Sequence, residues 1–390
     1  MSLKYGIETK PSQILATLRH IVNQNIKFSS QNQLSKRKSV CIWGNAGLGK
    51  TDLTKQLSNE VFTVNNQEVK PVVIHLPIAQ IEEAGDILGL PDKSENQTTV
   101  YLTPEWWPSE EKYKNKPVVL LIDDFNRADP RILNALMQVI QDKKSIGSSL
   151  AKYITIVLTG NEANSEDQYN VNDVDKAFLT RLFHITMTFD KLDWSVWASQ
   201  NHIDERVISW VLAYPELVDG KNGFRTNPRS VSDFGDLIKD ISNIDHDKDL
   251  VSILANGCMD SDQVASFMKF ALGDFQYIIP PDQILDNWEK AKTKLSTMKQ
   301  RSDSKKLRAD IMSLISYRVY LHMISPDLSF TDTQMSNFVQ YIQCSDFISE
   351  DMTFMLLRRL NTKENPHLEQ FRKVIAENDS DIVNMLKEVV

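Results

Sequence analysis

The chain has 390 residues, of which 25% are charged and 41% hydrophobic, with a formal net charge of −8. Such a composition is typical of a globular protein with two or three domains. The negative balance argues against a general nucleic-acid coat, because binding to a phosphate backbone needs clustered Lys and Arg. The N-terminal stretch lacks the apolar core of a signal peptide, and no apolar run approaches the roughly 20 residues of a membrane span. The three scattered cysteines form no CxxC pair, so we expect a cytoplasmic protein.

The N-terminal half of the chain begins with a helical pattern and continues with short apolar runs. Apolar residues at helical spacing predict a helix from Pro11 to about Asn25. Between Ser39 and Asp190, segments of helical pattern alternate with the runs SVCIW, KPVVIHL, KPVVLLI, YITIVLT and HITMTF. Runs that are apolar on both faces indicate a parallel sheet covered on both sides. The predicted fold class is therefore α/β, with an N-terminal helical segment over 1–35 and a core over 36–190.

After Asp190 the β-rich runs nearly vanish and almost everything has a helical pattern. The most basic stretch of the chain, EKAKTKLSTMKQRSDSKKLRAD, starts at Glu289 within this region. Such a stretch is typical of a solvated helix face, and contact with nucleic acid is the alternative. The seven histidines and the cysteines show no spacing typical of a metal site.

The first short run leads into a glycine-rich loop, although the chain has only 13 glycines. The loop reads GNAGLGKT, lies between a predicted strand and a predicted helix (TDLTKQLSNEVF), and fits the phosphate-binding pattern GxxxxGK[ST]. Glycine permits the positive φ and close backbone approach by which backbone N–H groups surround a phosphate. Lys50 would reach the β- and γ-phosphates, and the Thr51 hydroxyl would bind Mg²⁺. The predicted nucleotide-binding residues are Gly44, Asn45, Ala46, Gly47, Leu48, Gly49, Lys50 and Thr51.

A second run places two carboxylates at the end of a buried strand. Five apolar residues, 118–122, are followed by Asp123 and Asp124. Ligands of open α/β sheets bind at the carboxyl ends of strands, and a P-loop needs a carboxylate that holds the metal. We predict that Asp123 holds Mg²⁺ and that Asp124 orients or deprotonates the attacking water. An Asp-Asp turn without a catalytic role is the simpler alternative.

The order of these parts resembles an AAA+ ATPase, and LLIDDFNRADPRILNALMQVI is similar to the MoxR branch of that family. The branch typically has Asp-Glu-x-Asn-Arg-Ala at this point, so Asp124 stands where a catalytic glutamate is usual. The resemblance covers roughly residues 36–240. It implies ATP and Mg²⁺ as ligands, and a ring oligomer, expected to be a hexamer, as the active form.

The resemblance also implies three polar residues around the nucleotide. Asn161, at the end of YITIVLTGN, is similar to the sensor-1 position, which holds the attacking water. Arg181, in DVDKAFLTRLFHI, resembles the arginine finger that reaches a neighbour's γ-phosphate. Arg229, in GFRTNPRSV, resembles the sensor-2 arginine of the lid, and Arg225 is the less favoured alternative. For each residue a merely structural role remains the alternative.

Two insertions and a helical region complete the resemblance. Residues 78–108 look like the helix-2 insert of MoxR-type proteins, and residues 143–153 form a second candidate insert. The Trp-Trp pair of the first insert either packs the insert onto the sheet or grips a substrate. We expect a helical lid over 191–245 and a helical C-terminal extension over 246–390.

Three functions fit these observations. The first is a Mg²⁺-ATP-dependent ATPase that remodels or activates a protein partner, for which the family suggests a von Willebrand factor A domain. The second is a nucleic-acid-associated AAA+ loader or motor that uses the basic stretch after Glu289. The third is a switch that binds ATP with negligible hydrolysis, because aspartate replaces the usual glutamate at Asp124.

Overall fold

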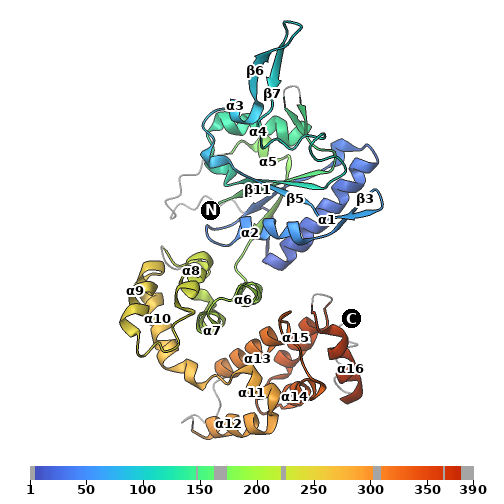
Figure 1. Cartoon of the computed structure of the whole chain (residues 1–390). Coiled ribbons are helices and arrows are strands. Elements are labelled where there is room, and N and C mark those ends of the chain that lie inside the picture. The colour runs from blue at the N-terminus through green and yellow to red at the C-terminus, as the bar shows by residue number, and fades with distance from the viewer. Residues whose placement is uncertain are drawn as a thin grey trace. The chain divides into compact units, whose positions relative to one another are not determined.

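The computed structural model forms two compact units, Met1–Asp190 and Lys191–Val390, which are described separately (Figure 1). The residues that the structure describes are 5–145, 148–161, 174–220, 225–301, 309–362 and 365–378.

The first unit is built on a six-stranded sheet of parallel strands. All five predicted strands are present, and a sixth, β1, pairs with β12 at the edge. Strand β1 has only three residues and no apolar run, so periodicity gave no signal for it. In spatial order the strands are β1 (Ile7–Thr9), β12 (Leu182–Met187), β2 (Ser39–Trp43), β11 (Ile154–Gly160), β8 (Val118–Asp123) and β5 (Val72–Pro77).

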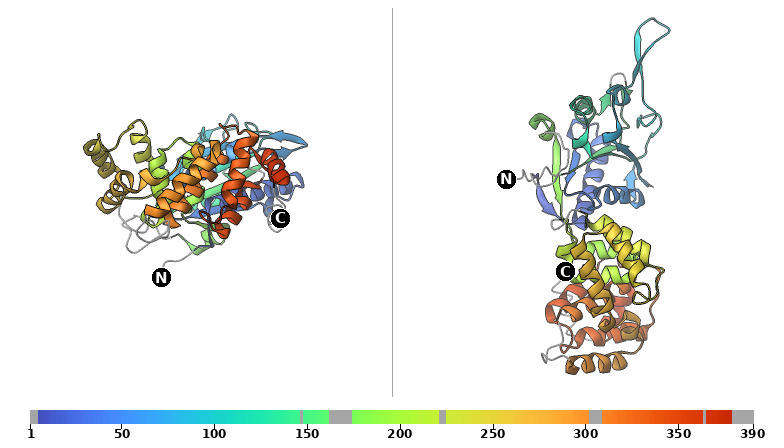
Figure 2. Two further views of the ribbon diagram at one scale, coloured as in Figure 1. Left: turned by 90° about the horizontal axis from the view of Figure 1, so that it is seen from below. Right: turned by 90° about the vertical axis from the view of Figure 1, so that its left-hand side faces the viewer.

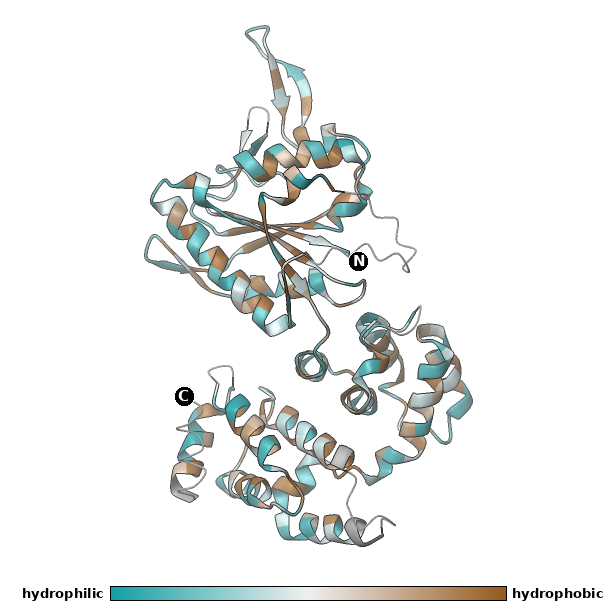
Figure 3. Ribbon diagram, turned by 180° about the vertical axis from the view of Figure 1, so that it is seen from behind, coloured by the Kyte–Doolittle hydropathy of each residue, from teal (hydrophilic) through white to brown (hydrophobic). Residues whose placement is uncertain are grey.

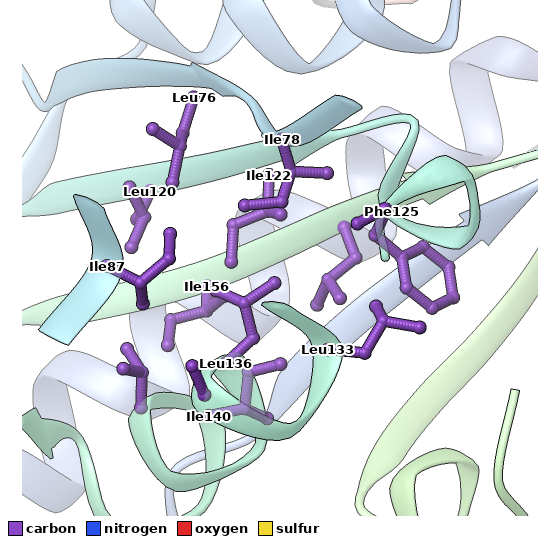
Figure 4. Packing of buried hydrophobic residues seen from close by; sticks show 14 of the residues in the cluster. Leu76, Ile78, Ile87, Leu120, Ile122, Phe125, Leu133, Leu136, Ile140 and Ile156 are labelled. Carbon is purple, nitrogen blue, oxygen red and sulfur yellow. The ribbon is translucent and has the colours of Figure 1, made fainter. Parts of the chain in front are cut away.

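Helices cover both faces of this sheet, as the sequence predicted. Helices α1 (Pro11–Ser30) and α2 (Lys50–Lys55) pack on one face. Helix α4 (Pro130–Asp142) packs on the other face with leucine and isoleucine side chains (Figure 4). Alternate residues of β8 enter the two cores, with Val119 on the α1 side and Leu120 on the α4 side. The central strands are therefore hydrophobic along their length (Figure 3).

The segment TDLTKQLSNEVF is not one continuous helix, and this prediction was wrong. Helix α2 ends at Lys55 and continues as a short 3-10 helix, Gln56–Asn59. Phe62 then begins strand β3 (Phe62–Val64), which pairs with β4 (Gln67–Val69). The two residues between these strands, Asn65 and Asn66, both have positive φ, 49° and 63°. A two-residue turn of this kind favours a hairpin, and tertiary packing of Phe62 overrides the helical pattern.

Both candidate inserts contain β-hairpins. The first has a short helix, α3 (Gly85–Leu88), and a hairpin of β6 (Leu90–Lys93) and β7 (Thr99–Leu102) that projects from the unit (Figures 1 and 2). The second has β9 (Lys144–Ser145) and β10 (Ser148–Ser149).

The Trp-Trp pair of the first insert packs inward. The Trp107 side chain is 2% exposed and belongs to the core on the α4 side of the sheet. Trp106 packs against the same core, and its Nε1 donates to the backbone oxygen of Asp86 at 3.0 Å. These contacts favour the packing interpretation over a substrate grip.

The regular elements described in the second unit are all helical. Arg318 is buried between helices, where it pairs with Glu205 and its guanidinium lies 5.4 Å from the centre of the Phe275 ring. The first part of the basic stretch, as far as Arg301, lies in helix α12. Residues 302–308 lie outside the described part. None of the described helices has the length and apolarity needed to cross a bilayer. The α-helices are α6 (Lys191–Gln200), α7 (Glu205–Ala213), α8 (Pro228–Ile238), α9 (Lys248–Cys258), α10 (Ser261–Leu272), α11 (Pro281–Asp286), α12 (Trp288–Arg301), α13 (Ala309–Met323), α14 (Asp332–Gln343), α15 (Glu350–Leu360) and α16 (Leu368–Asn378).

A buried lysine follows helix α4 in the first unit. Lys143 has a φ of 55°, its side chain is buried, and its Nζ donates to Ser39 Oγ and to the backbone oxygen of Ile140. Burial, together with the charge of Arg37, lowers the pKa of Lys143 to about 7. An unfolded lysine has a pKa of about 10.4, so the unfolded chain binds more protons between these values. Stability should therefore rise with pH from about 7 to about 10.

We expect Lys143→Met to remove this part of the pH dependence. Between pH 7 and pH 9 the wild type should gain about 2 kcal/mol in free energy of unfolding relative to the variant. Urea unfolding of both proteins at the two pH values measures the difference. Lys144→Met, at an exposed neighbour, is the matched control and should follow the wild type. Parallel pH profiles of wild type and Lys143→Met would show that the amine keeps an ordinary pKa.

Candidate functional site

The glycine-rich loop connects β2 to α2 at the carboxyl end of β2. Gly44, Gly47 and Gly49 have φ values of 146°, 78° and 88°, which other residues rarely adopt. A Cβ on Gly44 would also lie 2.7 Å from the backbone oxygen of Met187. The sequence places its glycines where this loop conformation requires them.

Lys50 folds back into the loop and is 6% exposed. Its Nζ donates to the backbone oxygens of Gly44 at 2.7 Å and Asn45 at 2.8 Å. A third bond, of 3.0 Å, goes to Oδ1 of Asn161 at the end of β11. The predicted phosphate-binding lysine and the predicted sensor-1 asparagine are therefore in direct contact.

Asp123 accepts hydrogen bonds on both carboxylate oxygens. Its Oδ1 accepts from the Thr51 hydroxyl at 2.7 Å and from the Thr159 hydroxyl, and its Oδ2 lies 3.0 Å from Nε2 of His75. Burial opposes ionisation, but the bonds from Thr159, Thr51 and His75 outweigh it and lower the pKa of Asp123. An ionised carboxylate beside a threonine hydroxyl is a donor set that fits Mg²⁺. Thr51 and Asp123 are therefore suited to the metal role predicted for them.

Asp124 lies next to this group in a tight turn, with a φ of 52°. Its backbone N–H donates to Thr159 Oγ1 at 3.0 Å. Its Oδ1 accepts a bond of 3.1 Å from Nδ2 of Asn161. The guanidinium of Arg127 is 3.6 Å from Oδ2, and both side chains are partly exposed, so this ion pair is weak. The structure thus brings Asp124 and Asn161 together beside Lys50.

Three further residues of the site had no predicted role. Asn126 is 3% exposed and joins the ends of β8 and β11. Its Nδ2 donates to the backbone oxygen of Asn161 at 2.7 Å, and its Oδ1 accepts from the backbone N–H of Asn161 at 3.2 Å. Thr159 and His75 contact Asp123, as described above. For His75 and Thr159, the available signal in the sequence was a polar residue inside an otherwise apolar run, VVIHL and IVLTG respectively.

Arg181 is exposed and follows the short helix α5 (Lys176–Leu179). Its Nε donates to Oε1 of Gln141 at 2.8 Å, and its guanidinium also bonds the backbone oxygen of Ala177. These partners lie on α4 and α5 and are not among the residues bonded to Lys50, Asp123 or Asp124. On α5, Phe178 stacks on Phe125 with ring centres 5.6 Å apart.

Arg229 and Arg225 belong to the second unit. Arg229 is exposed in the first turn of α8, after the N-cap Asn227. Arg225 donates to the backbone oxygens of Asn256 at 3.1 Å and Met259 at 2.9 Å. The guanidinium of Arg225 is thus engaged within its own unit, whereas Arg229 is an exposed residue of α8.

The parallel sheet, the glycine loop and the carboxylates at the strand ends define a P-loop nucleotide-binding fold of the AAA+ type. Residues 39–182 match the family model for the AAA domain of the dynein-related subfamily. A match to this family indicates ATP binding and ATPase activity.

The solved structures that match this chain include the following three. A putative ATPase from Cytophaga hutchinsonii ATCC 33406 has 13% identity and a TM-score of 0.26, over 46% of this chain and 53% of that one. Closed-state Hsp104 with ATPγS and FITC casein has 16% identity and a TM-score of 0.32, over 68% and 46%. A point mutant of RuvB from Thermotoga maritima has 13% identity and a TM-score of 0.33, over 65% and 69%.

The match spans about half the length of the first two structures. No curated protein matches the chain.

Proposed function

We propose that the protein is a Mg²⁺-ATP-dependent AAA+ ATPase of the MoxR type. The observation that carries the proposal is a hydrogen-bonded group at the strand ends. Lys50, Asn161 and Asp124 are bonded in series, and Thr159 joins them to the bonded pair of Asp123 and Thr51. The group lies at the carboxyl ends of parallel strands, where α/β sheets bind their ligands.

In this proposal the loop Gly44–Gly49 surrounds the phosphates, and the amine of Lys50 turns from the loop carbonyls to the β- and γ-phosphates. Thr51 and Asp123, whose side-chain oxygens are hydrogen-bonded to each other at 2.7 Å, would hold Mg²⁺. The metal would supply positive charge that stabilises the phosphoryl group during transfer.

Hydrolysis is assigned to the neighbouring pair. Asp124 would orient or deprotonate the attacking water, and Asn161, which already contacts Asp124, would hold that water in place. Aspartate is one methylene shorter than the glutamate usual in the MoxR branch, so we expect slow turnover. Arg229 would contact the nucleotide of its own chain from a lid over 191–245.

Arg181 would act on a neighbouring subunit. Its contacts are with Gln141 and Ala177, and its exposed position suits access from another chain. A finger supplied in this way requires a neighbouring chain, and we propose that the chains form a hexameric ring. The ring would remodel a protein partner, with a von Willebrand factor A domain as the partner that the family resemblance suggests.

The test is Asp124→Asn, which we expect to retain ATP binding and to lose phosphate release. Asparagine keeps the shape and can still bond to Asn161, but it cannot accept a proton from water. Fluorescent nucleotide titration and a phosphate-release assay measure the two properties separately. Asp142→Asn, an exposed carboxylate at the end of α4, is the matched control.

Hydrolysis at the wild-type rate by Asp124→Asn would show that another residue activates water. A wild type that binds ATP without releasing phosphate would instead favour the switch that binds ATP with negligible hydrolysis, the alternative suggested by the aspartate at position 124.

A further inference from the structure

His75 lies across the strands from Asp123. Strand β5 pairs with β8 so that Pro77 is opposite Asp123 and His75 is opposite Leu121. Residues two apart on a strand share a face, so His75 and Asp123 point to the same side of the sheet as diagonal neighbours. The Nε2 atom of His75 is 3.0 Å from Asp123 Oδ2. An ionised carboxylate only accepts hydrogen bonds, so Nε2 carries the hydrogen.

The bonds to Asp123 divide between its two oxygens. Oδ1 accepts both threonine hydroxyls, from Thr51 on α2 and Thr159 on β11. Oδ2 accepts the imidazole of His75. Rotation of the carboxylate would break bonds on both oxygens at once. The three partners therefore fix which oxygen faces Thr51.

We propose that His75 is a positioning residue for magnesium binding: it holds Oδ2 of Asp123 so that Oδ1 stays beside Thr51 and the metal. This inference rests on the proposed function of the same site. Outer partners that orient a ligating carboxylate typically contribute about 10–100-fold to metal affinity. The side chain of His75 is 34% exposed, so its replacement leaves no closed cavity.

The measurement is nucleotide affinity as a function of Mg²⁺ concentration, with a fluorescent ATP analogue as the probe. We expect His75→Leu to raise the Mg²⁺ concentration for half-maximal binding about tenfold. Affinity measured in EDTA should stay within about twofold, since the hydrogen bond of the imidazole goes to Asp123 and not to the glycine loop that would bind phosphate. His75→Gln restores an N–H donor of similar reach, so it should recover most of the Mg²⁺ response. Binding of Mn²⁺, followed by electron paramagnetic resonance, provides a second readout that needs no turnover.

His20→Leu replaces an exposed histidine on α1 and is the matched control. Asp123→Ala shows how far loss of the carboxylate itself shifts the Mg²⁺ concentration for half-maximal binding. If Asp123→Ala shifts the Mg²⁺ requirement and His75→Leu does not, the positioning role is refuted and the proposed function stands. An equal loss of affinity with and without Mg²⁺ in His75→Leu would indicate a structural role and also refute it. If Lys50→Ala and Asp123→Ala both bind like the wild type, the proposed function itself fails.

Discussion

Replacing Lys50 with alanine is expected to abolish tight ATP binding. The lysine is the one cation whose amine lies inside the glycine loop among the described residues, and it is almost fully buried there. When phosphates occupy the loop, its charge would face their oxygens with little water between them. Loss of one partner from a buried charge pair typically costs about 2–5 kcal/mol, which is roughly 30-fold or more in affinity.

Titration with a fluorescent ATP analogue measures this effect. Lys55→Ala is the matched control, because Lys55 is on the same short helix but exposed. Circular dichroism would establish that both variants fold, so that a loss of binding is not a loss of structure. Unchanged affinity in Lys50→Ala would remove the assignment of the loop to nucleotide phosphates.

The parts of this fold that could be predicted from sequence are those with a local signal. Runs such as VVLLI identify buried parallel strands because both of their faces enter a core. The contacts of Asp123 with Thr51 and of Asn161 with Lys50 agree with the same rule, since the carboxyl ends of parallel strands share one edge of the sheet.

The contacts that were missed depend on which strands are neighbours. The bonds from His75 and Thr159 to Asp123 exist because β5, β8 and β11 are adjacent in space. Residues 75 and 159 are far apart in sequence, and no periodicity links them. Strand β1 was missed for a similar reason, because three residues with little apolar character become a strand only when β12 lies beside them.

Mixing two inactive variants should restore part of the ATPase activity, if Arg181 acts on a neighbour's nucleotide. An Asp124→Asn chain has an inactive site of its own but still carries Arg181. An Arg181→Ala chain has an intact loop and carboxylates but offers no finger. Each variant alone should be nearly inactive, since a finger of this kind contributes roughly 10³–10⁵ in rate in well-studied cases.

In a mixed ring, some Arg181→Ala sites are adjacent to an Asp124→Asn chain and receive its arginine. With equal amounts and head-to-tail contacts, about a quarter of all sites would be complete. Phosphate release should rise accordingly as the ratio of the two chains approaches one to one. Arg131→Ala is the matched control for Arg181→Ala, because its guanidinium is exposed on α4 and its contacts are with Asp129.

Exchange of subunits must be shown independently, by energy transfer between differently labelled chains. If the subunits exchange and activity recovers, the arginine and the carboxylate must act from different chains, because neither variant holds both. Confirmed exchange without recovery would contradict the trans role, provided that sites fire without waiting for every neighbour. A ring containing a small fraction of Asp124→Asn among wild-type chains tests that condition: activity that falls in proportion to the fraction shows independent sites. With independent sites and no recovery, Arg181 would have a structural role through Gln141 and Ala177, the contacts it makes within its own chain.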